Sequence, residues 1–188
     1  MKKIAVTGLA GFTGNYVSKA LESKGYEVVG VISDIRDKAS LCDEIAAISP
    51  YAVIHLAAIS FPAHDDYKEI YDVNLHGSIN LLRASKNTKS IQKILLASSS
   101  NVYGNAEGSI DESTCTKPVS HYGISKLAME HAADAEGVEC IITRPFNYTG
   151  IGQAEHFLIP KIVSHFKRGL RNIELGNIDV SRDFSDVR

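Results

Sequence analysis

The chain has 188 residues, enough for one domain with a small addition. It is 44% hydrophobic and 22% charged with a net charge of −2, which excludes a disordered or collagen-like chain and argues against a nucleic acid partner. No apolar run approaches the roughly 18 residues that cross a bilayer, so no membrane partner is expected. Glycines soon after the N-terminal apolar run argue against a secretion signal, which predicts a cytoplasmic protein. The three cysteines are widely spaced, which argues against a disulfide framework and predicts no metal site.

Short apolar segments alternate with segments of helical periodicity. Strands are predicted over residues 3–7, 28–32, 52–56, 94–97 and 138–143. Helices are predicted before Gly25 and over residues 38–48, 67–85 and 122–135. This alternation predicts an α/β fold, a Rossmann-like doubly wound parallel sheet with helices on both faces.

The pattern changes after Arg144. Prolines and glycines interrupt it around a predicted helix over residues 157–168. We therefore expect a first domain over residues 1–144 and a small, loop-rich second region over residues 145–188.

Three glycines, Gly8, Gly11 and Gly14, lie between the first strand and the first helix. Glycine is needed where a chain turns tightly, where backbone touches a pyrophosphate, and where a helix packs closely on a strand. The amides at the helix N-terminus then face the phosphates. The turn predicts dinucleotide binding.

Tyr122 and Lys126 are four residues apart, hence on one face of a helix. A neighbouring cation favours the phenolate and lowers the phenol pKa from its usual value near ~10. Tyr122 is therefore a candidate general acid or base. The serine run 98–100 follows a predicted strand, at the edge where open parallel sheets bind ligands.

These segments, together with His55-Leu56-Ala57-Ala58, Asn74 and Val102-Tyr103-Gly104, occur in the order typical of the extended short-chain dehydrogenase/reductases. The chain resembles that family of nucleotide-sugar epimerases, dehydratases and reductases over essentially its whole length. The resemblance implies an enzyme in which Tyr122 exchanges a proton with the sugar and Lys126 holds the cofactor ribose. It further implies that Ser99 hydrogen-bonds the reacting oxygen and that Asn74 supports the geometry of the site.

The resemblance also implies NAD or NADP as the cofactor. The cofactor-binding positions it predicts are Gly8, Gly11, Phe12, Thr13, Gly14, Ser33, Asp34, Ile35, Arg36, Leu56, Ala57, Ala58, Ala97, Ser98, Tyr122, Lys126 and Pro145.

The choice between NAD and NADP stays open. Asp34 lies 20 positions after Gly14, where a ribose-binding acid is expected. Alternatively, Asp34-Ile35 corresponds to a pair that contacts adenine in the family, and the segment between the second and third strands is deleted. Ser33 and Arg36 would then receive a 2′-phosphate, and Asp34 a ribose hydroxyl.

The second region resembles two substrate-binding segments of the family. Residues 144–153 match an RxxNxxGxGQ pattern, and residues 176–188 a GNxD…RDFxDVR stretch typical of GDP-4-keto-6-deoxy-D-mannose reductases and GDP-mannose dehydratases. The substrate-binding positions that this resemblance implies are Ser100, Asn147, Gln153 and Arg182.

The reaction that we expect follows from a difference between this chain and the dehydratases of the family. Family 4,6-dehydratases carry acidic residues where this chain has Ser100 and Asn101, so dehydration is disfavoured. We expect reduction of the 4-keto group of an NDP-4-keto-6-deoxyhexose, with GDP-linked substrates favoured. The alternatives are an NAD-dependent UDP-hexose 4-epimerase and a non-catalytic NAD(P)-binding regulatory or scaffold protein.

The resemblance implies two further expectations. Family members commonly form homodimers through a four-helix bundle, to which residues 67–85 and 122–135 would contribute. Family members are also longer, so we expect a nearly complete cofactor-binding domain over residues 1–144 and only the beginning of a substrate-binding domain over residues 145–188.

Overall fold

The computed structural model describes all residues except 61–64, 177–178 and 180. The chain forms two compact units, Met1–Pro145 and Phe146–Arg188, and each is described by itself. Within the described residues, no helix combines the length and the apolar character needed to cross a bilayer.

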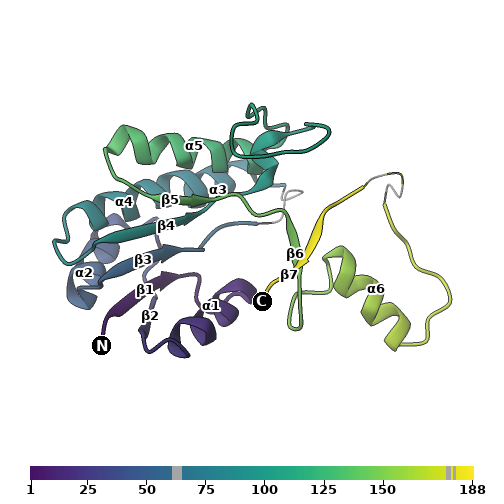
Figure 1. The fold of residues 1–188 in the computed structure, drawn as a ribbon, viewed down its shortest axis with the longest axis horizontal. Coiled ribbons are helices and arrows are strands. Elements are labelled where there is room, and N and C mark those ends of the chain that lie inside the picture. Colours follow the sequence, from purple (N-terminus) through teal and green to yellow (C-terminus); the bar gives the residue numbers. More distant parts are fainter. Residues whose placement is uncertain (61–64, 177–178, 180) are drawn as a thin grey trace. The chain divides into compact units, whose positions relative to one another are not determined.

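The first unit is built on a five-stranded sheet in the order β2-β1-β3-β4-β5, and all of its strand pairs are parallel. The strands are β1 (Lys3–Thr7), β2 (Glu27–Val31), β3 (Ala52–His55), β4 (Lys93–Ala97) and β5 (Ile141–Thr143). The helices are α1 (Phe12–Glu22), α2 (Lys38–Ile48), α3 (Tyr67–Tyr71), α4 (Ser78–Lys86) and α5 (His121–Glu136). Figure 1 shows the helices around this sheet. The predicted doubly wound fold is confirmed.

The sheet is buried on both faces. Successive side chains of a strand point to opposite faces, so Ala5 packs in one cluster while Ile4 and Val6 pack in the other. The first cluster contains buried residues of α2, α4 and α5, and the second is covered by side chains that include Leu21 of α1. The strand order reverses between β1 and β3, which puts the ligand crevice of such a sheet at their carboxyl ends.

The helix predicted over residues 67–85 contains a wider turn. A π-helical turn, η1 (Asp72–Gly77), separates α3 from α4. A Cβ on Gly77 would lie 2.6 Å from Cγ1 of Ile35, so η1 packs directly on the segment after β2. Single π turns are frequent at functional sites.

The last strand of the sheet starts later than predicted. Residues 138–140 precede β5, because α5 ends in a left-handed cap at Gly137 and the Val138 amide still donates to the Ala133 carbonyl at 3.0 Å. The first residues of the predicted strand therefore belong to the helix cap and the segment after it.

The second unit contains α6 (Leu158–Lys167) and a parallel pair of short strands, β6 (Asn147–Thr149) and β7 (Phe184–Asp186). The helix matches the prediction, whereas the strands were not predicted. No residue of α6 is buried, and Val163 and Phe166 are exposed.

Two glycines of the loop before α5 allow a matched test of backbone strain. Gly104 has φ +65° and a Cβ there would lie 1.9 Å from the Lys117 carbonyl oxygen, whereas Gly108 has φ +78° with nothing within 4 Å. Gly108→Ala should cost about 1 kcal/mol of unfolding free energy through its left-handed backbone. Gly104→Ala should cost a further ~1–3 kcal/mol from the clash. Urea unfolding measures both, and equal losses would contradict the described packing of Gly104.

Candidate active site

The glycine turn has a backbone that only glycine fits. Gly8 has φ +70°, and a Cβ on Gly14 would lie 2.4 Å from the Leu9 carbonyl oxygen. Helix α1 follows, with Gly11 as a cap that provides no side-chain acceptor and with no acidic residue in the first turn. Phe12 and Thr13 are the first helical residues. The turn thus leaves room for a pyrophosphate at a positively polarised helix end, so the residues fit the dinucleotide.

The turn after β3 touches the glycine turn. A Cβ on Gly8 would lie 2.8 Å from the Ala57 amide nitrogen. The Thr7 hydroxyl oxygen accepts from the amides of Leu56 at 3.2 Å and Ala57 at 3.1 Å. Ala58 is the next residue and is half-buried. The structure therefore brings two predicted cofactor segments together where the strand order reverses.

The end of β2 carries an ion pair. The Arg36 guanidinium lies 2.6 Å from the Asp34 carboxylate, and its hydrogen bonds hold the pKa of that carboxyl below its usual value. Glu44 of α2 accepts from the Ile32 amide at 2.9 Å and the Ser33 amide at 2.8 Å. Glu44 was not singled out in the sequence, because its partners are twelve and eleven residues away.

Ile35 points into the protein core rather than onto the surface. It is 6% exposed and belongs to the cluster beneath α2 and α4. Asn80 of α4 fixes the same segment, because its side-chain amide donates to the Ile35 carbonyl at 3.1 Å. Helix α2 follows this segment and leads into β3, an order that fits both alignments of Asp34.

The Tyr122 and Lys126 side chains lie on the buried face of α5, and they are 7% and 3% exposed. The Lys126 ammonium donates to the Ala97 carbonyl at the end of β4, over 2.8 Å. Burial lowers the pKa of Lys126 to about 8. The predicted helix face therefore reaches the carboxyl end of the sheet.

Ser99 lies in the serine turn, just before a 3₁₀ turn, η2 (Ser100–Tyr103). Its hydroxyl oxygen accepts from the Asn101 backbone amide at 3.2 Å and from the Asn101 side-chain amide at 3.1 Å. A Cβ on Gly123 would lie 2.7 Å from the Asn101 carbonyl oxygen. The first turn of α5, which holds Tyr122, thus packs directly on the turn that positions Ser99.

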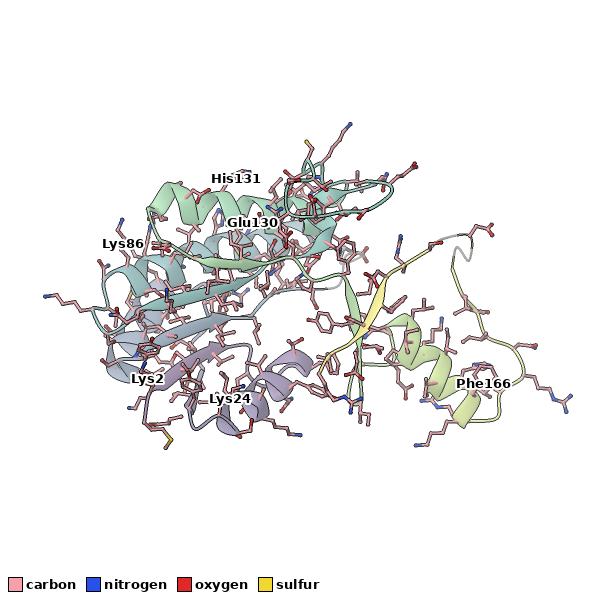
Figure 2. The ribbon with its side chains drawn as sticks, in the orientation of Figure 1. Lys2, Lys24, Lys86, Glu130, His131 and Phe166 are labelled. Atoms are coloured by element: carbon pink, nitrogen blue, oxygen red, sulfur yellow. The ribbon has the colours of Figure 1, made fainter. Side chains whose placement is uncertain are left out.

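Glu130 was missed by sequence reasoning. It lies two turns beyond Tyr122 on the same stripe of α5 and is 5% exposed, whereas His131 beside it is exposed (Figure 2). Its carboxylate accepts from the Ser98 hydroxyl and from the Arg144 guanidinium, whose shortest contact is 2.6 Å. This hydrogen bond raises the pKa of Arg144 further. The spacing from Tyr122 was the available signal.

Backbone pairing also fixes the serine turn. The Ser98 amide donates to the Thr143 carbonyl at 2.8 Å, and the Ser100 amide to the Pro145 carbonyl at 2.9 Å. Pro145 thus lies beside the predicted substrate residue Ser100. The Ser98 hydroxyl is engaged by Glu130.

Asn74 reaches Tyr122 indirectly. Its side-chain oxygen accepts from the Ile59 amide at 2.8 Å, and its side-chain nitrogen donates to the Ser125 hydroxyl at 3.1 Å. Ser125 in turn donates to the Tyr122 carbonyl at 2.8 Å. The predicted supporting asparagine therefore anchors the helix that carries Tyr122.

His55 is a buried residue with both ring nitrogens hydrogen-bonded, to Thr7 at 2.7 Å and Ser78 at 2.8 Å. Burial, with a smaller contribution from the Lys126 charge, lowers its pKa to about 3. His55 is therefore a core residue whose polar atoms are all hydrogen-bonded.

The second unit holds the remaining predicted positions. The Asn147 side-chain amide donates to the Asp183 carbonyl at 3.1 Å, next to the exposed Arg182. Gln153 folds back onto Tyr148 and accepts from the Thr149 hydroxyl at 2.8 Å. Residues 177 and 178 of the GNxD segment lie outside the described residues. No group of potential metal ligands occurs in the part of the chain that the structure describes.

Two carboxylates of α5 allow a matched test of the buried ion pair. Glu130→Gln should lower the free energy of unfolding by about 2–4 kcal/mol, because the Arg144 charge is left without its counterion in a largely buried setting. Glu136 pairs with Arg83 at the surface, so Glu136→Gln should change it little. Urea unfolding compares the two variants, and similar losses would contradict the importance of burial.

His55 predicts a dependence of stability on pH. Its pKa falls from 6.5 in the unfolded chain to about 3 in the folded protein. The unfolded state therefore takes up a proton first as the pH falls below about 6.5, and the folded state loses up to about 1.4 kcal/mol of stability per pH unit until the folded pKa is reached. His55→Gln should remove this slope. Urea unfolding at several pH values from about 7 to 5 measures it, and equal slopes in both proteins would contradict the assignment.

The sequence is similar to those of known proteins. The family model described as the NAD dependent epimerase/dehydratase family matches residues 4–188. GDP-6-deoxy-D-talose 4-dehydrogenase of Aggregatibacter actinomycetemcomitans is 36% identical over 98% of this chain and 66% of its own length. GDP-6-deoxy-D-mannose reductase of Pseudomonas aeruginosa is 36% identical over 100% and 67%. UDP-glucose 4-epimerase of Mycoplasma genitalium is 30% identical over 99% and 59%. The chain thus spans between 59% and 67% of the length of these curated relatives.

Solved structures agree in fold. A putative epimerase from Burkholderia cenocepacia has a TM-score of 0.92 at 40% identity, over 100% of this chain and 68% of that one. RMD from Pseudomonas aeruginosa, complexed with NADPH, has a TM-score of 0.86 at 34% identity, over 100% and 70%. The predicted family is confirmed: this chain belongs to the NAD dependent epimerase/dehydratase family, the nucleotide-sugar branch of the extended short-chain dehydrogenase/reductases.

Proposed function

We propose that the protein is a nucleotide-sugar oxidoreductase that reduces the 4-keto group of an NDP-4-keto-6-deoxyhexose, GDP-linked, with NADH or NADPH. One observation carries the proposal. Tyr122 and Lys126 lie on the buried face of a helix whose first turn packs on the turn holding Ser99, at the carboxyl edge of the sheet.

The nicotinamide, when bound, supplies the hydride. The glycine turn and the α1 N-terminus bind the pyrophosphate, and Lys126 holds the ribose. Tyr122 donates the proton to the sugar oxygen as general acid.

Ser99 is arranged to donate. Its oxygen accepts two hydrogen bonds, both from Asn101, so its own proton is left to point toward a third partner. In the proposed reaction that partner is the sugar 4-oxygen, and Ser99 holds it in place while the proton arrives from Tyr122.

The residues after Ser99 argue for reduction over dehydration. Ser100 and Asn101 carry no carboxylate, and the Asn101 side-chain amide donates a hydrogen bond to the Ser99 hydroxyl. The chain thus offers no acid at the positions from which family dehydratases remove a proton. A UDP-hexose 4-epimerase is the second candidate, because a relative with that name matches nearly the whole chain and the same three side chains could serve it.

The names of two relatives favour a GDP-linked 6-deoxyhexose as substrate. In the second unit, Asn147 bonds the backbone beside Arg182, which places an amide and a guanidinium on neighbouring segments. Guanidinium geometry suits a diphosphate, so these two residues would bind that group. The proposal includes a cytoplasmic homodimer.

Absorbance of the reduced nicotinamide tests the reaction. The purified protein should oxidise NADH or NADPH when GDP-4-keto-6-deoxymannose is added. Tyr122→Phe should lower kcat by ~100-fold or more, because the general acid is lost. Tyr51→Phe, at the opposite end of the sheet, should leave it unchanged.

Each other outcome has a consequence. Interconversion of a UDP-hexose without net oxidation would replace the reductase by the epimerase. Cofactor binding without turnover of either substrate would favour a regulatory or scaffold protein, and full activity of Tyr122→Phe would remove the proposed acid.

A further inference from the structure

A network of buried, hydrogen-bonded polar side chains runs from β1 to α5 beside the candidate active site. Thr7, His55, Ser78, Asn74 and Ser125 are each at most 1% exposed. Thr7 and His55 are register partners on neighbouring strands, with 2.7 Å between Oγ1 and Nδ1. Burying five polar side chains is costly unless all of them are hydrogen-bonded.

The direction of the hydrogen bonds is determined at the β1 end. Thr7 Oγ1 accepts from the amides of Leu56 and Ala57, so its own proton must go to His55 Nδ1. The neutral ring then carries its proton on Nε2, which donates to Ser78 Oγ over 2.8 Å. The Ser78 hydroxyl donates to the Asn74 backbone carbonyl over 2.6 Å. Each hydroxyl proton and each ring nitrogen therefore has a partner that fits its role as hydrogen-bond donor or acceptor.

The hydrogen-bond network continues through the side-chain amide of Asn74. The Asn74 oxygen accepts from the Ile59 amide, which leaves its nitrogen to donate to the Ile59 carbonyl at 3.1 Å and to Ser125 Oγ at 3.1 Å. Ser125 donates to the backbone carbonyl of Tyr122. One end of this hydrogen-bond network therefore holds the turn that lies against Gly8, and the other end holds the residue proposed as general acid, Tyr122.

We propose that His55, neutral and protonated on Nε2, is a positioning residue that fixes the cofactor-side turn at Leu56 and Ala57 relative to the first turn of α5. Its catalytic consequence rests on the proposed function, whereas its protonation state does not. A misplacement of about 1 Å between reacting groups can lower a rate by ~100-fold.

Protonation of His55 on Nδ1 would break this arrangement. The Thr7 hydroxyl would then have to accept from the ring, in competition with the amides of Leu56 and Ala57. Thr7 of β1 and Ser78 of α4 contact the ring, and Lys126 of α5 is close enough for its positive charge to disfavour a second one on the ring. The neutral tautomer is therefore built into the fold.

The first test needs no activity. Long-range ¹H–¹⁵N correlation spectra of the imidazole rings, with His55 assigned by its loss in His55→Gln, should show the neutral Nε2–H tautomer from about pH 5 to about pH 9. A proton on Nδ1 at any pH in that range would overturn the inference.

The second test separates positioning from a purely structural role. A glutamine amide can present an acceptor to Thr7 and a donor to Ser78, so His55→Gln should keep kcat within about threefold. His55→Leu removes both groups and should lower kcat by ~10-fold or more, with smaller changes in the KM values of cofactor and substrate. His131→Gln, an exposed histidine of α5, is the matched control (Figure 2). Equal kcat values for His55→Leu and the unmodified protein would overturn the inference, as would equal losses in His55→Leu and His55→Gln.

Ser78→Ala is a smaller change at the next link and covers the case in which His55→Leu does not fold. It should lower kcat in the same way, since it disconnects His55 from Asn74, and an unchanged kcat would overturn the inference. Absence of turnover in the unmodified protein would overturn the proposed function alone, because the tautomer measurement still decides the state of His55.

Discussion

The arrangement of the whole site depends on the close contact between the turns that follow β1 and β3. No side chain fits at Gly8, because a Cβ there would lie 2.8 Å from the Ala57 amide nitrogen. The two turns meet where the strand order reverses, and the Thr7 hydroxyl joins them through the amides of Leu56 and Ala57. The backbone amides of the first turn and of α1 are therefore held at one fixed place on the sheet. Any group that reacts with a cofactor bound there must be positioned relative to that contact.

Three interactions of different kinds hold α5 against this frame. Asn74 and Ser125 attach its first turn by neutral hydrogen bonds, and the Lys126 ammonium attaches its middle to the Ala97 carbonyl. Farther along, Glu130 attaches it to Arg144 by a largely buried ion pair. Ser125, Lys126 and Glu130 are all buried, so these contacts constrain both the position of α5 along its axis and its rotation about that axis. This explains how a single tyrosine in its first turn can be placed accurately by a helix packed on the edge of the sheet.

Features that depend on residues close in sequence were predictable. The first four strands, the glycine turn and the Tyr122–Lys126 pair follow from spacing over a few residues, and the structure has them close to the predicted positions. The partnership of Asn74 with Ser125 spans 51 residues and that of Glu44 with Ile32 spans twelve, so no local pattern indicates them. The π turn was missed because its apolar spacing continues that of the flanking helices. Strands β6 and β7 have three residues each, too few for alternation to be visible.

Neither of the two buried titratable groups discussed above, Glu130 and His55, neutralises the positive charge of Lys126. The Glu130 carboxylate is engaged by Arg144, and His55 is held neutral, so neither compensates the ammonium of Lys126. The described hydrogen bond of Lys126 goes to a neutral carbonyl, and burial lowers its pKa to about 8. Keeping this cation charged therefore opposes folding. A negative charge that develops nearby, on a tyrosine that has given up its proton, would be stabilised by the same ammonium in a medium where charges are weakly screened. The buried lysine thus lowers the stability of the resting protein, and under the proposed function it would favour the state in which Tyr122 has donated its proton.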